Sequence, residues 1–275
     1  MTAATLPVAM PVAAPLPTAR ASTVFLALMR RDLRVIRREL PFFVLRTILQ
    51  PLLFVIVFGY LLPRMRYVGG TYTTALLPGI IAVSLTLSAI QSVSLPLVQD
   101  FGWTKEIEDR LLAPIPTRWI AIEKIVMGMV QALLAAGFLL PLARLIMGPI
   151  AGLSLAHVGA AIVVTILGAA TFSALGLLIG TAISPQQIGL MFSIIISPMI
   201  FFGCAYYPWR GLDAVPWAKY AVLVNPLVYV AEGMRGALTP EVPHMPLPVA
   251  SLALVALLAV FVTLGVRSFE RKAVG

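Results

Sequence analysis

The densest group of charged side chains lies in the segment 100–118, DFGWTKEIEDRLLAPIPTR, where seven of nineteen residues are charged. Opposite charges recur there at a spacing of four residues, which supports a short exposed helix. Apolar residues at the same spacing give this helix, predicted over 104–113, a narrow apolar stripe, and Pro114 and Pro116 end it. Such a helix is suited to docking into a groove of a soluble protein, whereas a solvated loop is the alternative. The candidate docking residues are Trp103, Lys105, Glu106, Ile107, Asp109, Arg110 and Leu111.

A second group of polar residues interrupts the apolar segment 217–238, WAKYAVLVNPLVYVAEGMRGAL. Asn225-Pro226 breaks this segment at its centre. Glu232 and Arg235 lie one helical turn apart, where they can form an ion pair, and a paired charge near lipid depth costs less than a lone one. We therefore expect a re-entrant pair of short helices in the outer leaflet, shielded by protein, with the ion pair bracing an outer gate.

The sequence contains no arrangement of residues that is typical of a metal site, and no intrachain disulfide is possible. His157 and His244 are far apart and lack cysteine or carboxylate neighbours at ligand spacing, and Cys204 is the single cysteine. Two functions that a hydrophobic chain could have are those of an integral-membrane lipid-modifying enzyme and of an ion-coupled carrier, and both stay open as alternatives. The first needs clustered acids or histidines, and the second needs an ionisable group at the middle of the membrane. The acids of the charged segment are instead interleaved with bases, and Arg46 and Glu123 are expected near the ends of spans.

The composition of the chain is that of an integral membrane protein. Hydrophobic residues make up 60% of the chain and charged residues 11%, against roughly 25% in soluble proteins, and the mean hydropathy is +0.99. The net charge of +9 does not indicate nucleic-acid binding, because the basic residues lie where a membrane topology needs them. Since a helix needs about 20 apolar residues to cross a bilayer, we predict an all-α fold with six transmembrane helices. They are expected at 42–62, 75–98, 120–143, 158–183, 187–207 and 247–266.

A tail and an amphipathic helix are predicted ahead of the first span. Residues 1–23 contain four prolines and lack the basic start of a signal peptide, so we expect them to form a disordered cytoplasmic tail. The rest of the chain, 24–275, is predicted to be one transmembrane domain. The domain begins with an amphipathic interface helix over 25–40, which Pro41 is expected to end. Five arginines on one face of this helix would lie on anionic lipid. The opposite face is apolar and consists of Phe25, Leu28, Met29, Leu33 and Ile36.

The distribution of lysine and arginine predicts the orientation of the chain. With the amino terminus inside, 13 of these residues lie in the predicted inner segments and six in the outer ones. Because inner loops of membrane proteins are enriched in lysine and arginine, both termini are expected in the cytoplasm. The charged segment between the second and third spans is then cytoplasmic as well.

This layout resembles the permease subunits of ABC-2 type transporters. The charged segment resembles the family pattern E-x-G-T-x-x-x-L-x-x-x-P-x-x-R, although Trp103-Thr104-Lys105 replaces the usual Gly-Thr. The segment 201–208, FFGCAYYP, resembles the family's exit from the fifth span. The first resemblance is carried by Gly102, Glu106, Leu111, Leu112, Pro114 and Arg118. The family's N-P-x-x-Y-x-x-E-x-x-R motif is resembled by Asn225, Pro226, Tyr229, Glu232 and Arg235.

The resemblance implies an exporter of the drug, antibiotic or lipid-like branch in the cytoplasmic membrane of a prokaryote. The charged helix would be its coupling helix, which a separate ATPase subunit pushes when that subunit binds ATP and Mg²⁺. The sequence itself contains no G-x-x-x-x-G-K-[ST] phosphate-binding loop, and so no cofactor is expected on this chain. A second permease copy, identical or different, and membrane lipid are the other expected partners.

The resemblance also implies a substrate path between two permease copies, along the first, second and fifth spans. Polar side chains in these apolar spans are candidates to line it, although each could instead form a hydrogen bond between helices, which contributes about 1 kcal/mol or less. Gly176 and Gly180, one turn apart in the fourth span, predict close packing within the chain. The candidate path residues are Gln50, Gln91, Ser94, Ser193 and Ser197.

Overall fold

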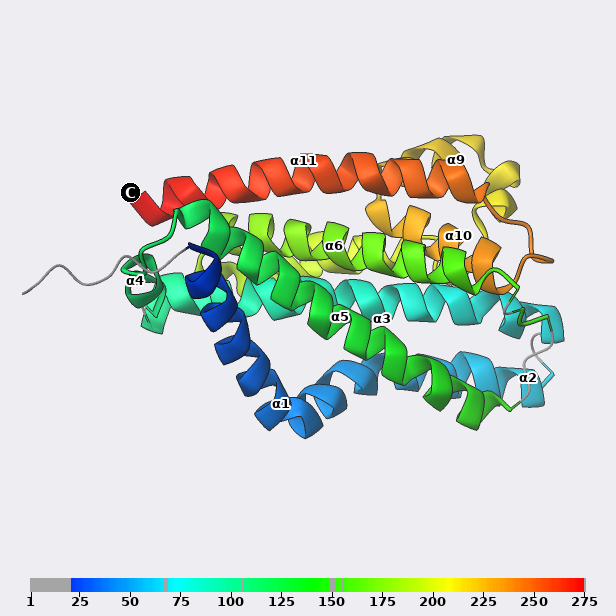
Figure 1. The fold of residues 1–275 in the computed structure, drawn as a ribbon. Coiled ribbons are helices and arrows are strands. Elements are labelled where there is room, and N and C mark those ends of the chain that lie inside the picture. Colours follow the sequence, from blue (N-terminus) through cyan, green and yellow to red (C-terminus); the bar gives the residue numbers. More distant parts are fainter. Residues whose placement is uncertain (1–20, 67–68, 105, 149–151, 155, 275) are drawn as a thin grey trace, which may run out of the picture.

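The computed structural model describes residues 21–66, 69–104, 106–148, 152–154 and 156–274, and the regular elements within these ranges are all helical. Long helices lie side by side, and short helices join them at the two ends (Figure 1). The longer elements are α1 (Ala21–Phe54), α3 (Gly70–Gln99), α5 (Thr117–Met147), α6 (Val158–Ala182), α10 (Pro226–Leu238) and α11 (Leu247–Val274). The shorter ones include α2 (Leu62–Arg64), α4 (Glu106–Leu111), α7 (Ile188–Leu190), α8 (Ser197–Phe201) and α9 (Pro216–Ala221).

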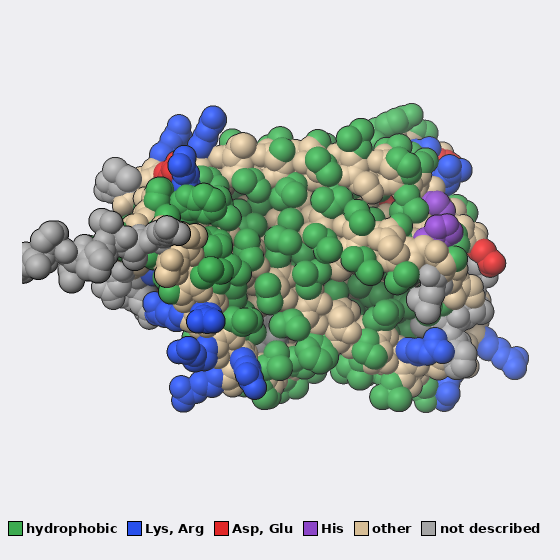
Figure 2. Space-filling view, in the orientation of Figure 1, with side chains coloured by type: hydrophobic (Ala, Val, Ile, Leu, Met, Phe, Trp, Pro, Cys, Tyr) green, Lys and Arg blue, Asp and Glu red, His purple; other side chains and the backbone are tan. Residues whose placement is uncertain are grey.

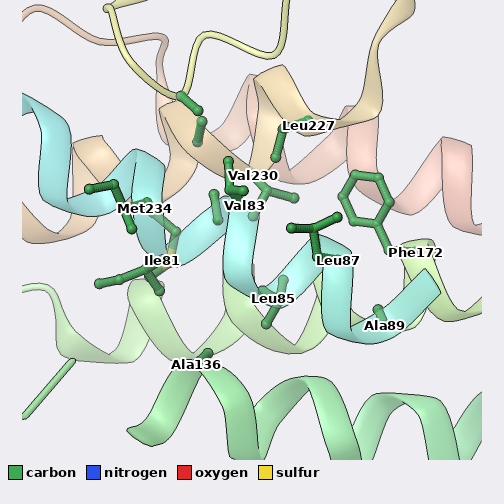
Figure 3. Packing of buried hydrophobic residues seen from close by; sticks show 14 of the residues in the cluster. Ile81, Val83, Leu85, Leu87, Ala89, Ala136, Phe172, Leu227, Val230 and Met234 are labelled. Atoms are coloured by element: carbon green, nitrogen blue, oxygen red, sulfur yellow. The ribbon is translucent and has the colours of Figure 1, made fainter. Parts of the chain in front are cut away.

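Helix α3 forms the centre of the bundle, where α5, α6 and α10 surround it. Figure 3 shows apolar side chains along α3, with Ile81 and Val83 beside Met234 and Val230 of α10 and Leu87 beside Phe172 of α6. Close approach of α6 to α3 requires small residues, since a Cβ on Gly180 would lie 2.9 Å from the Cα of Ser94. This contact confirms that the glycine pair of α6 serves packing within the chain.

Within the described residues, four helices are long and apolar enough to cross a membrane, namely Tyr72–Gly102, Thr117–Met147, Val158–Ala182 and Leu247–Ala273. The predicted spans 42–62 and 187–207 correspond to shorter apolar helical segments, Leu49–Arg64 and Pro185–Phe201. Both contain a π-helical stretch, Val55–Leu61 in one and Met191–Ile196 in the other. Pro63 follows the first stretch and Pro198 follows the second. A proline leaves the carbonyl four residues earlier, here that of Gly59 or Ile194, without its amide partner, which favours such irregular turns.

The amphipathic helix and the first apolar segment form one continuous element, which differs from the sequence-based expectation. Pro41 lies inside α1 and does not end it; Figure 1 shows that α1 instead turns a corner along its length. A proline within a helix produces such a bend because its ring displaces the preceding turn. Of the predicted tail, residues 21–23 belong to the first turn of α1, and residues 1–20 lie outside the described residues.

The two ends of the bundle carry different elements. The start of α1, the short helix α4 and the end of α11 lie at one end, whereas α2, α9 and α10 lie at the other (Figure 1). Between them the visible surface is mainly hydrophobic, with lysine and arginine gathered at both ends (Figure 2). The predicted docking helix and the predicted re-entrant motif are therefore separated by the length of the bundle.

Candidate functional site

A cluster of largely buried charged residues joins α4 to α1, to α5 and to the turn that follows α3, at one end of the bundle. Arg110 of α4 donates two hydrogen bonds of 3.2 Å to the two carboxylate oxygens of Asp32 in α1. Its Nη1 also lies 3.7 Å from Glu123 Oε2 in α5. Lys124 Nζ lies 3.9 Å from Asp32 Oδ2 and 3.7 Å from Asp100 Oδ2. We call Asp32, Asp100, Arg110, Glu123 and Lys124 the charge cluster.

The electrostatics of the charge cluster hold Asp32 and Arg110 in their charged forms. Burial alone would raise the pKa of Asp32, but the charge of Lys124 and the hydrogen bonds from Arg110 outweigh it and lower that pKa. Burial likewise opposes the charge of Arg110, and the hydrogen bonds to Asp32 raise its pKa overall. Two-pronged contact between a guanidinium and a carboxylate fixes distance and orientation. The contact therefore joins α4 to α1 as a stiff connection.

Asp32 is the acid at the centre of the charge cluster, and the sequence analysis did not single it out. It lies four residues after Leu28 and four before Ile36, on the inward face of α1, whereas Leu33 of the predicted apolar face is exposed. An acidic residue at helical spacing within an apolar stripe is the signal that could have identified it, because such a residue is buried only when it is paired.

The predicted docking residues do not all face the same way. Ile107 is 3% exposed and packs with Val93, Leu97 and Ile120 of the bundle. Leu112, directly after α4, is 82% exposed. The side chain of Ile107 therefore anchors α4, whereas that of Leu112 is exposed. Lys105 lies outside the described residues, as do the side chains of Trp103, Glu106 and Asp109, and Leu111 is half-buried.

At the other end of the bundle, Glu232 and Arg235 form the predicted ion pair one turn apart on α10, and both are fully buried. Glu232 accepts hydrogen bonds from the backbone amides of Trp209 (2.9 Å) and Met245 (2.8 Å). Arg235 donates to the backbone carbonyls of Ala75 (3.2 Å) and Cys204 (3.0 Å). The pair thus ties α10 to α3 and to two connections, the one between α8 and α9 and the one between α10 and α11.

The rest of the re-entrant motif builds the start of α10. Asn225 caps this helix, because its side-chain oxygen accepts a hydrogen bond of 3.0 Å from the amide of Leu227, and its Nδ2 donates to the carbonyl of Met199. Pro226 occupies the first helical position, where its missing amide is not needed. The Tyr229 hydroxyl donates to the carbonyl of Leu223 at 2.7 Å.

The candidate path residues are dispersed over the chain. Ser94 is buried between α3 and α6, and Gln91 is half-buried. Gln50, Ser193 and Ser197 are exposed on segments 49–64 and 185–201. Neither of the two cavities that flank α1 is lined by any of the five. Within one copy these residues do not form a common site.

The charge cluster lies beside a cavity at α1. This cavity of about 350 Å³ is bounded by α1, α3 and α5, and Asp32, Asp100, Arg110 and Lys124 contribute to its wall. Ser92 and Gln131 add uncharged polar groups, and Val35 and Met127 add apolar ones. A displacement of α4 would therefore change the width of a mixed polar and apolar cavity.

Comparison with known proteins gives two matches. The family model described as ABC-2 type transporter matches residues 23–239. A curated protein of Cyanophora paradoxa named "Putative transport permease ycf38" is 29% identical over 226 residues, which cover 77% of this chain and 72% of that protein. The matched range contains α4, the charge cluster and the Glu232–Arg235 pair.

Proposed function

Because the chain belongs to the ABC-2 type transporter family, we propose that it is the membrane permease subunit of an ATP-driven exporter. It moves an amphipathic small molecule or a lipid-linked substrate outward across the cytoplasmic membrane. The segments 49–64 and 185–201 act as spans together with the four long helices, which gives six spans and places both termini in the cytoplasm. A separate ATPase subunit supplies the energy and binds ATP and Mg²⁺.

The contact between Arg110 and Asp32 is the observation that carries this proposal. A coupling helix must transmit a push from a soluble partner to the spans. Helix α4 is only six residues long, but its arginine reaches α1, and Glu123 and Lys124 extend the charge cluster into α5. Because buried charges cannot separate without a large penalty, a push on α4 moves α1 with it.

The path for substrate lies between two permease copies in this proposal. Gln50, Ser193 and Ser197 are exposed on the two shorter apolar segments and would face the second copy. At the outer end, the buried contacts of Glu232 and Arg235 hold α10 and its connections as a closed rim above the path. Those contacts act as the brace of the outer gate.

Co-purification of the tagged chain from its native membrane tests the proposal. We expect an ATPase with a phosphate-binding loop to be retained in stoichiometric amount by the wild-type chain. Leu112→Glu should reduce that amount at least about tenfold, since a charge placed at the centre of an apolar contact costs about 1–3 kcal/mol. The measurement is quantitative mass spectrometry of the purified complex.

Leu112→Met is the matched control, because it keeps an apolar side chain of similar volume at the same position. It should retain the ATPase as the wild type does. A stable, monodisperse wild-type chain without any ATPase would contradict the proposed function. Equal retention by wild type and Leu112→Glu would place the contact elsewhere.

A further inference from the structure

A groove separates the first half of α1 from α5 and adjoins the cavity beside the charge cluster, with which it shares Arg31 and Met127. Its volume is about 610 Å³. One wall is formed by Met127 and Val130 of α5, within a helix that is apolar enough to cross a membrane. The other wall is α1, which contributes Thr23, Leu26, Ala27, Met29, Arg30, Arg31, Leu33 and Arg34.

The charges that line this groove are of one sign. Arg30, Arg31 and Arg34 are among its lining residues, and within the described part of the chain no acidic residue is. Arg30 and Arg34 are four residues apart and thus lie on one face of α1, both exposed. A pair of guanidinium groups at this spacing can hold a phosphate group by several charge-assisted hydrogen bonds.

The remaining lining is apolar and largely exposed. Leu26 is 61% exposed and Leu33 is 51% exposed, although both border the groove. With Met127 and Val130 opposite, they form a channel that suits a hydrocarbon chain in size and polarity. A water-soluble anion would leave this apolar surface uncovered, which disfavours free phosphate as the occupant.

We propose that this groove is a binding site for one anionic phospholipid from the bilayer leaflet next to α4. The lipid phosphate lies on Arg30 and Arg34, and one acyl chain runs between α1 and α5 along Met127 and Val130. Because Asp32 lies on the same turns of α1, a lipid held here also keeps α1 in place against the charge cluster. The site is a property of the permease chain alone and does not depend on an ATPase partner.

The proposal differs from general attraction of a basic helix to an anionic surface. Arg37 and Arg38 are also exposed on α1 but do not line the groove. General attraction depends on the number of charges near the surface and not on their positions. Lipid binding at a specific site requires Arg30 and Arg34, and it does not depend on Arg37 and Arg38.

The test compares two variants of equal charge in the purified full-length chain. Dioleoyl phosphatidylglycerol is titrated into the detergent-solubilised protein, and the first bound lipid is counted by native mass spectrometry. Arg30→Ala with Arg34→Ala should weaken binding of this lipid by about thirtyfold, and Arg37→Ala with Arg38→Ala should leave it unchanged. Val130→Phe, which fills the apolar wall, should weaken it while all arginines remain.

Dioleoyl phosphatidylcholine is the lipid control, because it has the same chains and no net charge. It should bind the wild-type chain far more weakly than phosphatidylglycerol does. Equal effects of the two double variants would overturn the proposal in favour of general attraction. Equal binding of the two lipids, or full binding by Val130→Phe, would overturn it as well.

Discussion

Arg235→Met is expected to lower the unfolding temperature of the purified chain by roughly 10 °C or more, since removing one partner of a buried ion pair costs about 3–5 kcal/mol. The substitution leaves the Glu232 carboxylate fully buried without its counter-charge. It also removes the donors to the carbonyls of Ala75 and Cys204, so that two connections to α10 are lost together.

The chain contains its own reporter for this measurement. Cys204 is the single cysteine and is fully buried, and its backbone carbonyl accepts a hydrogen bond from Arg235. A thiol-reactive dye will therefore label the chain only when this region opens. The temperature at which labelling begins measures the loss of stability directly at the affected site.

Lys219→Met is the matched control because it breaks an ion pair at the same end of the bundle, between Lys219 and Asp213. Asp213 is exposed, and exposed ion pairs contribute about 0–1 kcal/mol, so labelling should begin within a few degrees of the wild-type temperature. Equal unfolding temperatures for Arg235→Met and Lys219→Met would mean that the buried pair does not hold this end together.

Gly79 shows how tightly the segment around Cys204 is packed. A Cβ at Gly79 of α3 would lie 1.7 Å from the carbonyl oxygen of Ala205. Cys204, the residue before Ala205, has a φ of 53°, a left-handed conformation that few residues other than glycine adopt. The carbonyl of Cys204 is thus directed at Arg235 by a strained backbone, which explains why loss of the arginine should loosen this segment first.

Asp32→Asn is expected to weaken the coupling between α4 and the spans while the chain still folds. The ATP-dependent movement of α1 should fall at least about fivefold, given typical coupling energies of 1–3 kcal/mol. Neutralising Asp32 leaves Arg110 with Glu123 at 3.7 Å and Lys124 with Asp100 at 3.7 Å, so both bases keep an acidic neighbour. The substitution replaces the carboxylate that accepts both 3.2 Å hydrogen bonds from Arg110 by a neutral amide, so the ion pair between α4 and α1 is lost.

The measurement uses the complex with the ATPase and needs no knowledge of the transported substrate. A cysteine is introduced at Leu53, which is exposed near the end of α1, in a chain that carries Cys204→Ser. The rate of thiol labelling is compared with and without ATP. We expect ATP to change this rate in the parent complex, and the change to shrink at least about fivefold in Asp32→Asn.

Glu39→Gln provides the control, as the same acid-to-amide change on the same helix and beside the same cavity, at an exposed residue. It should respond to ATP as the parent does, and Asp32→Glu should restore much of the response. Equal responses of Asp32→Asn and Glu39→Gln would show that the Arg110–Asp32 contact does not transmit the movement.

Much of the fold follows from local sequence features. Apolar runs of about 20 residues predict membrane-crossing helices, and four such helices are present. Asn225-Pro226 predicts a break, which the structure shows as the capped start of α10. Pro41, which was predicted to end a helix, is an exception. It lies inside α1, because contacts with α3 and α5 hold the helix on both sides of the bend.

The sequence by itself determined the all-helical membrane class, the family and the Glu232–Arg235 pair, because these depend on composition, motif order and contacts within one helical turn. Only the tertiary structure decided the partner of Arg110. Its carboxylate lies 78 residues earlier in the chain, and no periodicity relates residues that far apart. The inward position of Ile107 and the groove between α1 and α5 were likewise decided by packing, since both depend on where a second helix lies.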